Sequence, residues 1–178
     1  MLILLLLLIL GMVIGHEITH AFDVTGRNYD AFGNIKNWWG NISTKHFKRK
    51  AECFNKQYSS YTVGKKKLNG YLTLDENIAD NGGLKLAYKT YKKFQSKNED
   101  KLSSSDYLID DKLFFIGFAQ SFCSISTRFY AENSIEIDPH TFAKYRVIGA
   151  LSNSFEFSKT FNCPLNSPMN PPEKCRIW

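Results

Sequence analysis

Apolar residues recur every three or four positions along much of the chain, and this spacing predicts a fold made mainly of helices. The clearest example is the segment 43–58, in which Phe47, Ala51, Phe54 and Tyr58 fall on one face that we expect to pack in the core. The same reasoning predicts further helices over 12–22, 76–94, 112–125, 142–151 and 154–161. Turns and loops are expected over 23–40, 65–67, 96–106 and 162–178. We therefore expect a mainly α fold with little or no sheet.

Residues 1–10 are almost all leucine or isoleucine, and the apolar run continues only as far as Ile14. A helix that spans a bilayer needs about 20 apolar residues. A signal peptide needs a basic segment before its apolar one, and none is seen here. We interpret residues 1–10 as an artefact, with a short anchor or signal-like segment as the alternative. Residues 11–178 are long enough and apolar enough for one domain.

The chain carries a net charge of +6, which raises the question of a nucleic-acid partner. Its lysines are scattered over separate segments, and no motif that reads bases accompanies them. We therefore expect solvated surface charges and no nucleic-acid partner. A weak attraction to acidic peptides or to membrane headgroups stays open, and with it an association with membranes.

One motif carries specific chemistry, because His16-Glu17-Ile18-Thr19-His20 reads H-E-x-x-H within an apolar, helix-compatible stretch. Residues four apart lie on the same face of a helix, so both imidazoles can point at one metal ion. Glu17 is turned about 100° away, where it can reach a metal-bound water without being a ligand. The alternative is a pair of surface histidines beside an ordinary helical glutamate.

A catalytic zinc site needs a third protein ligand and one open position. The metzincin pattern would place Gly and His where this chain has Asp23 and Gly26. Thermolysin-like enzymes would carry a glutamate near Trp38, Trp39 and Gly40, and none stands there. The third ligand must therefore come from elsewhere in the chain.

Glu76 and Glu52 are the glutamates available between His20 and Ala79. Glu52 lies among basic residues, at 48–50, and is more simply a solvated partner of those charges. Glu76 stands four residues before Asp80 on a predicted helix, so the two carboxylates share one face. One can bind the metal while the other accepts a hydrogen bond from a ligand imidazole. We expect one Zn²⁺ per chain.

With these motifs in place, the chain resembles the C-terminal catalytic part of the neprilysin and endothelin-converting-enzyme family of membrane zinc endopeptidases. The resemblance runs from about Gly11 to Trp178. The segments that carry it, in the family's order, are 13–23, Trp38-Trp39, Asn69-Gly70, Glu76 to Gly83, Asp138-Pro139-His140 and Cys175-Arg176-Ile177-Trp178. It implies a zincin, thermolysin-like catalytic subdomain. It also implies an endopeptidase that cuts small extracellular peptides on the amino side of hydrophobic residues.

The resemblance implies a role for each residue of the site. His16, His20 and Glu76 would bind zinc, and Glu17 would be the general base that deprotonates the zinc-bound water. The resemblance also implies roles for residues that surround these four.

Asp80 and Asp23 would orient the two ligand histidines, in that order. His140 would stabilise the oxyanion that forms during catalysis, and Arg146 would hold a backbone carbonyl of the substrate. Two positions depart from the family's pattern. Phe142 replaces a usual proline in the loop of His140, and Asp75 replaces a glycine, which adds a negative charge beside the metal site. We expect tuning there.

The four cysteines are even in number, and they allow three pairings in an oxidising compartment. The resemblance pairs Cys53 with Cys175, and pairs Cys123 and Cys163 with cysteines of an upstream half. The alternatives are that the latter two pair with each other, or stay buried and reduced. Asn41-Ile42-Ser43 is a glycosylation sequon. Together these features predict the secretory pathway and an extracellular or cell-surface location.

In the resembling family an upstream half covers the active-site cleft and supplies an edge strand that aligns peptide substrates. We find no such segment in this sequence. Three function classes therefore stay open: a zinc endopeptidase, a truncated fragment that binds zinc without turnover, and a non-enzymatic module. The third predicts a damaged metal site, whereas all the expected site residues are present.

Overall fold

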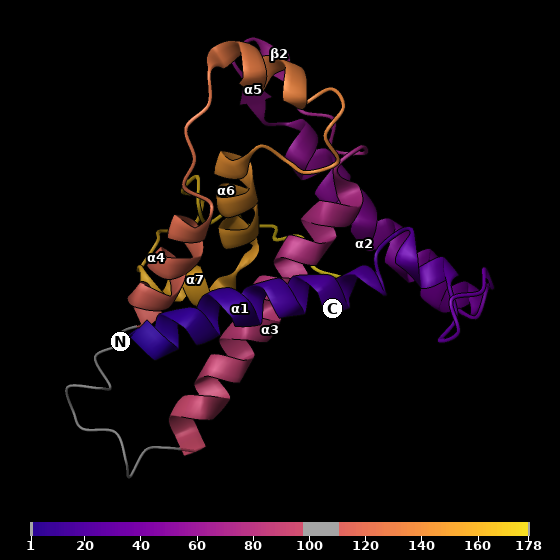
Figure 1. Ribbon diagram of the computed structural model, residues 1–178, viewed down its shortest axis with the longest axis horizontal. Helices are drawn as coiled ribbons and strands as arrows, with labels where there is room; N and C mark the ends of the chain where they lie inside the picture. The colour runs from indigo at the N-terminus through magenta and orange to yellow at the C-terminus, as the bar shows by residue number, and fades with distance from the viewer. Residues whose placement is uncertain (1, 98–110, 178) are drawn as a thin grey trace.

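The computed structural model describes residues 2–97 and 111–177, and helices dominate them (Figure 1). The elements in chain order are α1 (Leu2–His20), η1 (Gly26–Asn28), α2 (Asn41–Ser59), β1 (Thr62–Val63), β2 (Lys66–Lys67), α3 (Leu74–Lys97), α4 (Asp111–Ser121), α5 (Arg128–Ser134), α6 (Ala143–Asn153) and α7 (Phe155–Thr160). Within these residues the sheet is a single antiparallel pair of strands. The predicted mainly α fold with little sheet is confirmed.

Helices α1 and α3 cross at the centre of the molecule, and glycines let their backbones touch (Figure 1). A methyl group on Gly83 would lie 2.7 Å from the carbonyl oxygen of Met12 and 2.8 Å from the backbone nitrogen of His16. A methyl group on Gly15 would lie 3.0 Å from the Cα atom of Gly83. The expected close approach at Gly82-Gly83 is therefore present, and it brings the two halves of the site together.

The close contact between α1 and α3 predicts that a larger residue at position 83 destabilises the fold. Gly83→Ala should lower the free energy of unfolding by about 1–3 kcal/mol relative to Gly11→Ala, because the clashing atoms are backbone and cannot rotate away. Gly11 is the matched control, since it lies on α1 and an added methyl group there would only meet Ala87 at 3.9 Å. Both variants gain the same helix propensity. Urea unfolding measures the difference, and equal stability of the two variants would contradict this account of the crossing.

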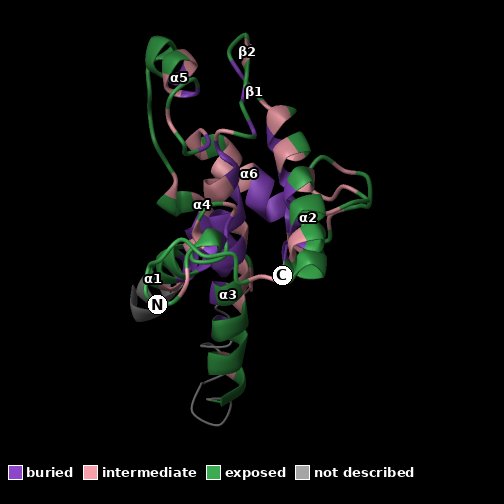
Figure 2. Ribbon diagram, turned by 90° about the vertical axis from the view of Figure 1, so that its right-hand side faces the viewer, coloured by how far each residue is buried: buried purple, intermediate pink, exposed green. Residues whose placement is uncertain are grey.

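Two aromatic clusters form most of the core. Figure 2 shows buried residues concentrated where α3 meets α4 and α6, whereas the C-terminal end of α3 is exposed. The first cluster joins α1, α3, α4, α6 and α7, and its largest buried members are Tyr91, Phe114, Phe115, Phe118 and Phe157. The second joins α2 to the start of α3 and to the C-terminal tail. It contains the four residues predicted to line the buried face of α2, namely Phe47, Ala51, Phe54 and Tyr58.

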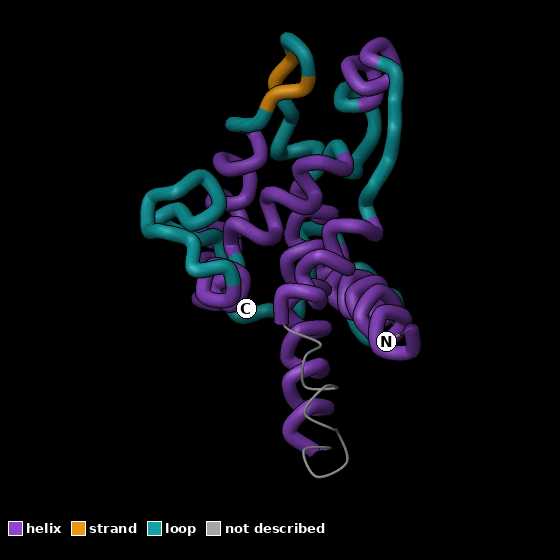
Figure 3. The backbone as a smooth tube through the Cα atoms, turned by 90° about the vertical axis from the view of Figure 1, so that its left-hand side faces the viewer, coloured by secondary structure: helices purple, strands orange, loops and turns teal. Residues whose placement is uncertain are grey.

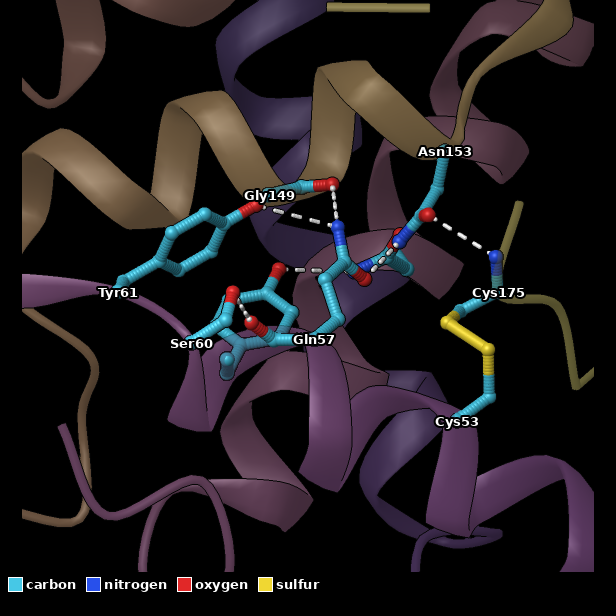
Figure 4. The surroundings of a disulfide bond; sticks show 9 residues. Cys53, Gln57, Ser60, Tyr61, Gly149, Asn153 and Cys175 are labelled. Atoms are coloured by element: carbon cyan, nitrogen blue, oxygen red, sulfur yellow. Dashed lines mark hydrogen bonds between the residues drawn. A yellow bond between two sulfur atoms is a disulfide. The ribbon is translucent and has the colours of Figure 1, made fainter. Parts of the chain in front are cut away.

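A disulfide between Cys53 and Cys175 ties the C-terminal tail to α2 (Figure 4). Asn153, at the end of α6, reinforces this tie because its side-chain oxygen accepts a hydrogen bond from the Cys175 backbone nitrogen at 2.9 Å. Its amide nitrogen donates to Gln57 and to Asn81, each at 2.9 Å. One partly buried network of hydrogen bonds therefore joins the tail, α2, α3 and α6.

Cys123 and Cys163 are free, so they do not pair with each other. Cys123 is also exposed, so the alternative of two buried, reduced thiols is wrong for that residue. Cys123 belongs to a segment after α4, residues 123–130, that lies entirely on the surface.

Removing the disulfide should weaken the fold strongly. The bond joins residues 122 positions apart, and the loss of a native disulfide typically costs about 2–5 kcal/mol. We expect Cys53→Ser, or a reducing agent, to lower the free energy of unfolding in that range. Cys123→Ser is the control and should change nothing. A urea midpoint that is the same with and without reductant would contradict the prediction.

Several predicted boundaries need correction. Helix α1 begins at Leu2, before the expected residue 12, and ends at His20. It runs unbroken past residue 10, where we drew a domain boundary that stays a prediction. Helix α4 ends at Ser121, earlier than expected, and the short helix α5 was not foreseen. Thr127 caps α5 by accepting a hydrogen bond from the Tyr130 backbone nitrogen at 3.2 Å.

The predicted loop at 65–67 is partly wrong, because Lys66 and Lys67 form β2 and pair with β1 (Figure 3). Gly64 allows the tight turn between the strands, with a φ of 59°. Of the polar loop expected over 96–106, positions 98–106 lie outside the described residues, and Ser96 belongs to α3. Among the described helices, none is both long and apolar enough to cross a membrane.

Candidate metal centre

The two histidines of the H-E-x-x-H motif lie one turn apart near the C-terminal end of α1. Their Nε2 atoms are 3.1 Å from each other. The side chain of His16 is buried and that of His20 is partly exposed. The helical spacing therefore places two nitrogen atoms at one point, with one side of that point open to solvent.

Glu76 reaches the same point from the first turn of α3. Its Oε2 atom lies 3.2 Å from His16 Nε2, and its Oε1 atom lies 3.5 Å from His20 Nε2. Ligand atoms bound tetrahedrally about 2.1 Å from a zinc ion would be about 3.4 Å apart. The observed separations fit that spacing, and two imidazoles with one carboxylate are a donor set of catalytic zinc sites.

Each histidine has a carboxylate behind it. His16 Nδ1 lies 3.0 Å from Oδ1 of Asp80, which is fully buried, and His20 Nδ1 lies 2.7 Å from Oδ2 of Asp23. A carboxylate on Nδ1 favours the tautomer that leaves Nε2 free to bind a metal, and it raises the basicity of that nitrogen. His20 is hydrogen-bonded to Asp23, whereas the buried Nδ1 atom of His16 lies close to Asp80 without a hydrogen bond among the described residues. The orienting roles expected of the two aspartates stay predictions.

The electrostatics of the cluster favour a cation. Burial lowers the pKa of His16, but the carboxylates of Asp80 and Glu76 outweigh it and raise that pKa to about 9. Burial raises the pKa of Glu76, yet the neighbouring His16, His140 and His20 bring it below its ordinary value. Because a metal must bind the neutral imidazole, a proton and a metal ion compete for this site below about pH 9.

One carboxylate oxygen of Glu76 has no hydrogen-bond partner among the described residues. Its Oε2 atom is buried and accepts no hydrogen bond from the described residues, although His16 and His140 lie within 3.3 Å. A buried carboxylate oxygen without a partner is costly. A divalent cation at the centre would supply that partner, so the residues present fit a zinc ion.

Glu17 follows His16 on α1, and its side chain is exposed to solvent. It is therefore not one of the three converging residues. Its expected role as the general base stays a prediction.

His140 lies at the rim of the centre, with Nε2 at 3.3 Å from Oε2 of Glu76. The Oδ1 atom of Asp138 accepts a hydrogen bond from the His140 backbone nitrogen at 2.8 Å and lies 3.0 Å from His140 Nδ1. The next residue, Thr141, is buried and donates its hydroxyl to Asn77 at 2.6 Å. Asn77 and Thr141 were not foreseen, because no local pattern connects residues 64 positions apart.

Arg146 is held by Asp80 through two hydrogen bonds, from Nε to Oδ2 at 2.8 Å and from Nη2 to Oδ1 at 2.7 Å. Its Nη2 atom is also 3.9 Å from Oε2 of Glu76. The arginine therefore fixes the carboxylate that stands behind His16, a contact the sequence did not reveal. Its expected contact with a substrate carbonyl stays a prediction.

Two further features that the sequence predicted, a disulfide and a glycosylation sequon, lie away from the centre. The Cys53–Cys175 bond is present. Asn41 begins α2 and is exposed, so its sequon is accessible to a modifying enzyme.

Known proteins with similar sequences include two human enzymes. The chain is 51% identical over 170 residues to human endothelin-converting enzyme 1 and 46% identical over 174 residues to human membrane metallo-endopeptidase-like 1. Each match covers 95% of this chain but 22% of the relative. The chain therefore spans about a fifth of the length of these relatives.

Solved structures show the same fold. The zinc metalloprotease ZMP1 of Mycobacterium tuberculosis, in complex with an inhibitor, superposes with a TM-score of 0.83 at 30% sequence identity. That match covers 95% of this chain and 27% of the other. The sequence model of peptidase family M13 matches residues 8–177, nearly the whole chain. This chain belongs to peptidase family M13.

Proposed function

We propose that the chain carries the zinc centre of an endopeptidase that cuts small extracellular peptides on the amino side of hydrophobic residues. The observation that supports this most is the convergence of His16, His20 and Glu76, whose ligand atoms lie 3.1–3.5 Å apart. The membership in family M13 supports peptidase chemistry in general.

In this proposal each residue has a defined task. Zinc, when bound, acts as a Lewis acid and lowers the pKa of water towards ~7. His16, His20 and Glu76 hold it, while Asp80 and Asp23 keep the two imidazoles in place. Glu17 takes a proton from the attacking water and later delivers it to the leaving amine.

His140 and Arg146 would contact the substrate. The imidazole of His140 is half exposed at the rim, where it can stabilise an oxyanion. A guanidinium has five N–H groups, and the two hydrogen bonds from Arg146 to Asp80 use two of them. The others can bind a backbone carbonyl of the substrate.

The disulfide and the exposed sequon support a secretory compartment. The relatives' names, endothelin-converting enzyme and membrane metallo-endopeptidase-like, support peptide substrates and an association with membranes. Helix α1 exposes Ile14 and Ile18 by 58% and 54%, and Phe22 after it by 39%. The matches cover 22% of these longer relatives, and we infer that another part of such a longer protein covers this apolar surface.

A second candidate is a fragment that binds zinc without turnover. The observation in its favour is the same exposed surface of α1, beside the metal centre. A quenched fluorescent peptide with one central hydrophobic residue distinguishes the two. Hydrolysis that a chelator stops and added zinc restores supports the endopeptidase. Bound zinc with no hydrolysis supports the fragment, and a folded chain indifferent to zinc contradicts both.

A further inference from the structure

Asp75 joins the start of α3 to the turn that follows α1. Its Oδ1 atom accepts a hydrogen bond from the Val24 backbone nitrogen at 2.9 Å, and its Oδ2 atom accepts one from the Thr25 hydroxyl at 2.5 Å. Asp75 directly precedes the ligand Glu76, so the two contacts connect segments about 50 positions apart, next to the metal centre.

The same turn holds Asp23 in place. Asp23 is 3% exposed, and its Oδ1 atom accepts hydrogen bonds from the backbone nitrogens of Thr25 at 2.9 Å and Gly26 at 2.6 Å. Its Oδ2 atom faces His20. Gly26 folds so closely onto the end of α1 that a Cβ atom there would overlap the carbonyl oxygen of His20. The turn therefore fixes the carboxylate that orients His20.

We propose that Asp75 is a positioning residue. It acts through the 23–26 turn and Asp23, and it keeps the imidazole of His20 facing the carboxylate of Glu76. The turn lies beyond the end of α1. Backbone hydrogen bonds within it, from Arg27 to Asp23 at 3.4 Å and from Asn28 to Thr25 at 3.1 Å, hold it locally. The two contacts of Asp75 attach it to the start of α3. The proposal rests on the proposed zinc function, because it concerns the geometry of a zinc ligand.

This role differs from the charge effect that the sequence suggested for Asp75. A charge acts on a cation whatever the hydrogen bonds of the carboxylate are, whereas a positioning residue acts through those bonds. An asparagine can accept from Val24 through its oxygen and donate to the Thr25 hydroxyl through its nitrogen. Asp75→Asn therefore removes the charge and keeps the contacts.

The test is the zinc dissociation constant of the whole chain, measured by competition with a chelator well below the unfolding temperature of each variant. Loss of a residue that directly contacts a metal ligand typically weakens binding about 10- to 100-fold. Because Asp75 acts one step further away, Asp75→Ala should weaken zinc binding about three- to tenfold. Asp75→Asn should stay within about twofold of the unsubstituted chain.

Asp30 provides the matched control. Its Oδ1 atom accepts from the backbone nitrogens of Phe32 and Asn34 at 2.9 and 3.0 Å, so it closes a turn in the same connection. It contacts none of the three converging residues, and Asp30→Ala should leave zinc binding unchanged. The double variant Asp23→Ala, Asp75→Ala tests the route. If Asp75 acts through Asp23, its removal should have almost no further effect once Asp23 is gone.

The outcomes separate this proposal from the proposed function. If the chain binds zinc and Asp23→Ala weakens it, but Asp75→Ala does not, the positioning role is wrong and the zinc centre stands. Equal losses in Asp75→Asn and Asp75→Ala, or additive losses in the double variant, also overturn it. If the unsubstituted chain binds no zinc, both proposals fail. Should Asp75→Ala not fold, Thr25→Val replaces it; a twofold or larger loss supports the role, and no loss contradicts it.

Discussion

Glu17→Gln is expected to lower the rate of peptide hydrolysis by about 10²- to 10⁴-fold, the usual contribution of a positioned general base. The amide has nearly the same shape as the carboxylate but cannot accept a proton from water. Zinc content should stay at one ion per chain, because Glu17 is exposed and is not among the three converging residues. Initial rates on a quenched peptide, together with zinc analysis of the same sample, measure both effects.

Glu52→Gln is the matched control for this experiment. Glu52 lies on α2, is exposed, and contacts Asn55 at 3.2 Å. The same chemical change at that position should leave both rate and zinc content unaltered. If Glu17→Gln retains most of the activity with its zinc in place, the general base is another group, and the assignment of Glu17 is wrong.

Glu76→Ala should weaken zinc binding by more than about 100-fold. Loss of a residue that only contacts a metal ligand typically weakens binding by up to about 100-fold, and Glu76 is a proposed ligand itself. The substitution removes one of three ligands and the carboxylate that faces both imidazoles at 3.2 and 3.5 Å. Two imidazoles alone leave the ion with too few protein donors for a catalytic site. Competition with a chelator, as for Asp75, measures the dissociation constant.

The control for this change is Glu136→Ala, which removes an exposed glutamate paired with Lys66 next to the β1–β2 hairpin. The experiment is best done with Cys123 and Cys163 replaced by serine, because free thiolates also bind zinc. Equal affinities in Glu76→Ala and Glu136→Ala would contradict the assignment of the third ligand.

The parts of the site that local spacing determines could be predicted from the sequence. His16 and His20 are four residues apart on a helix, as are Glu76 and Asp80, so each pair shares a face wherever its helix lies. The buried stripe of α2 follows from the same periodicity. The disulfide was different, because counting cysteines left three pairings and only the resemblance selected Cys53 with Cys175.

The contacts between segments could not be predicted, because they depend on how α1 and α3 cross. Arg146 meets Asp80 across 66 positions, and Asp75 meets the turn after α1 across about 50. Neither contact has a local signature. The elements that were missed, α5 and the β1–β2 hairpin, are short, so they contain too few positions to show a period.

The most direct test of the metal centre is X-ray absorption at the zinc edge, on the folded chain loaded with one equivalent of zinc. We predict a first shell of nitrogen and oxygen at about 2.0–2.2 Å, with the outer scattering of two imidazoles. Sulfur scattering at about 2.3 Å would place the ion on a free cysteine instead. That result, or a folded chain that retains no zinc, would contradict the convergence of His16, His20 and Glu76 on one ion.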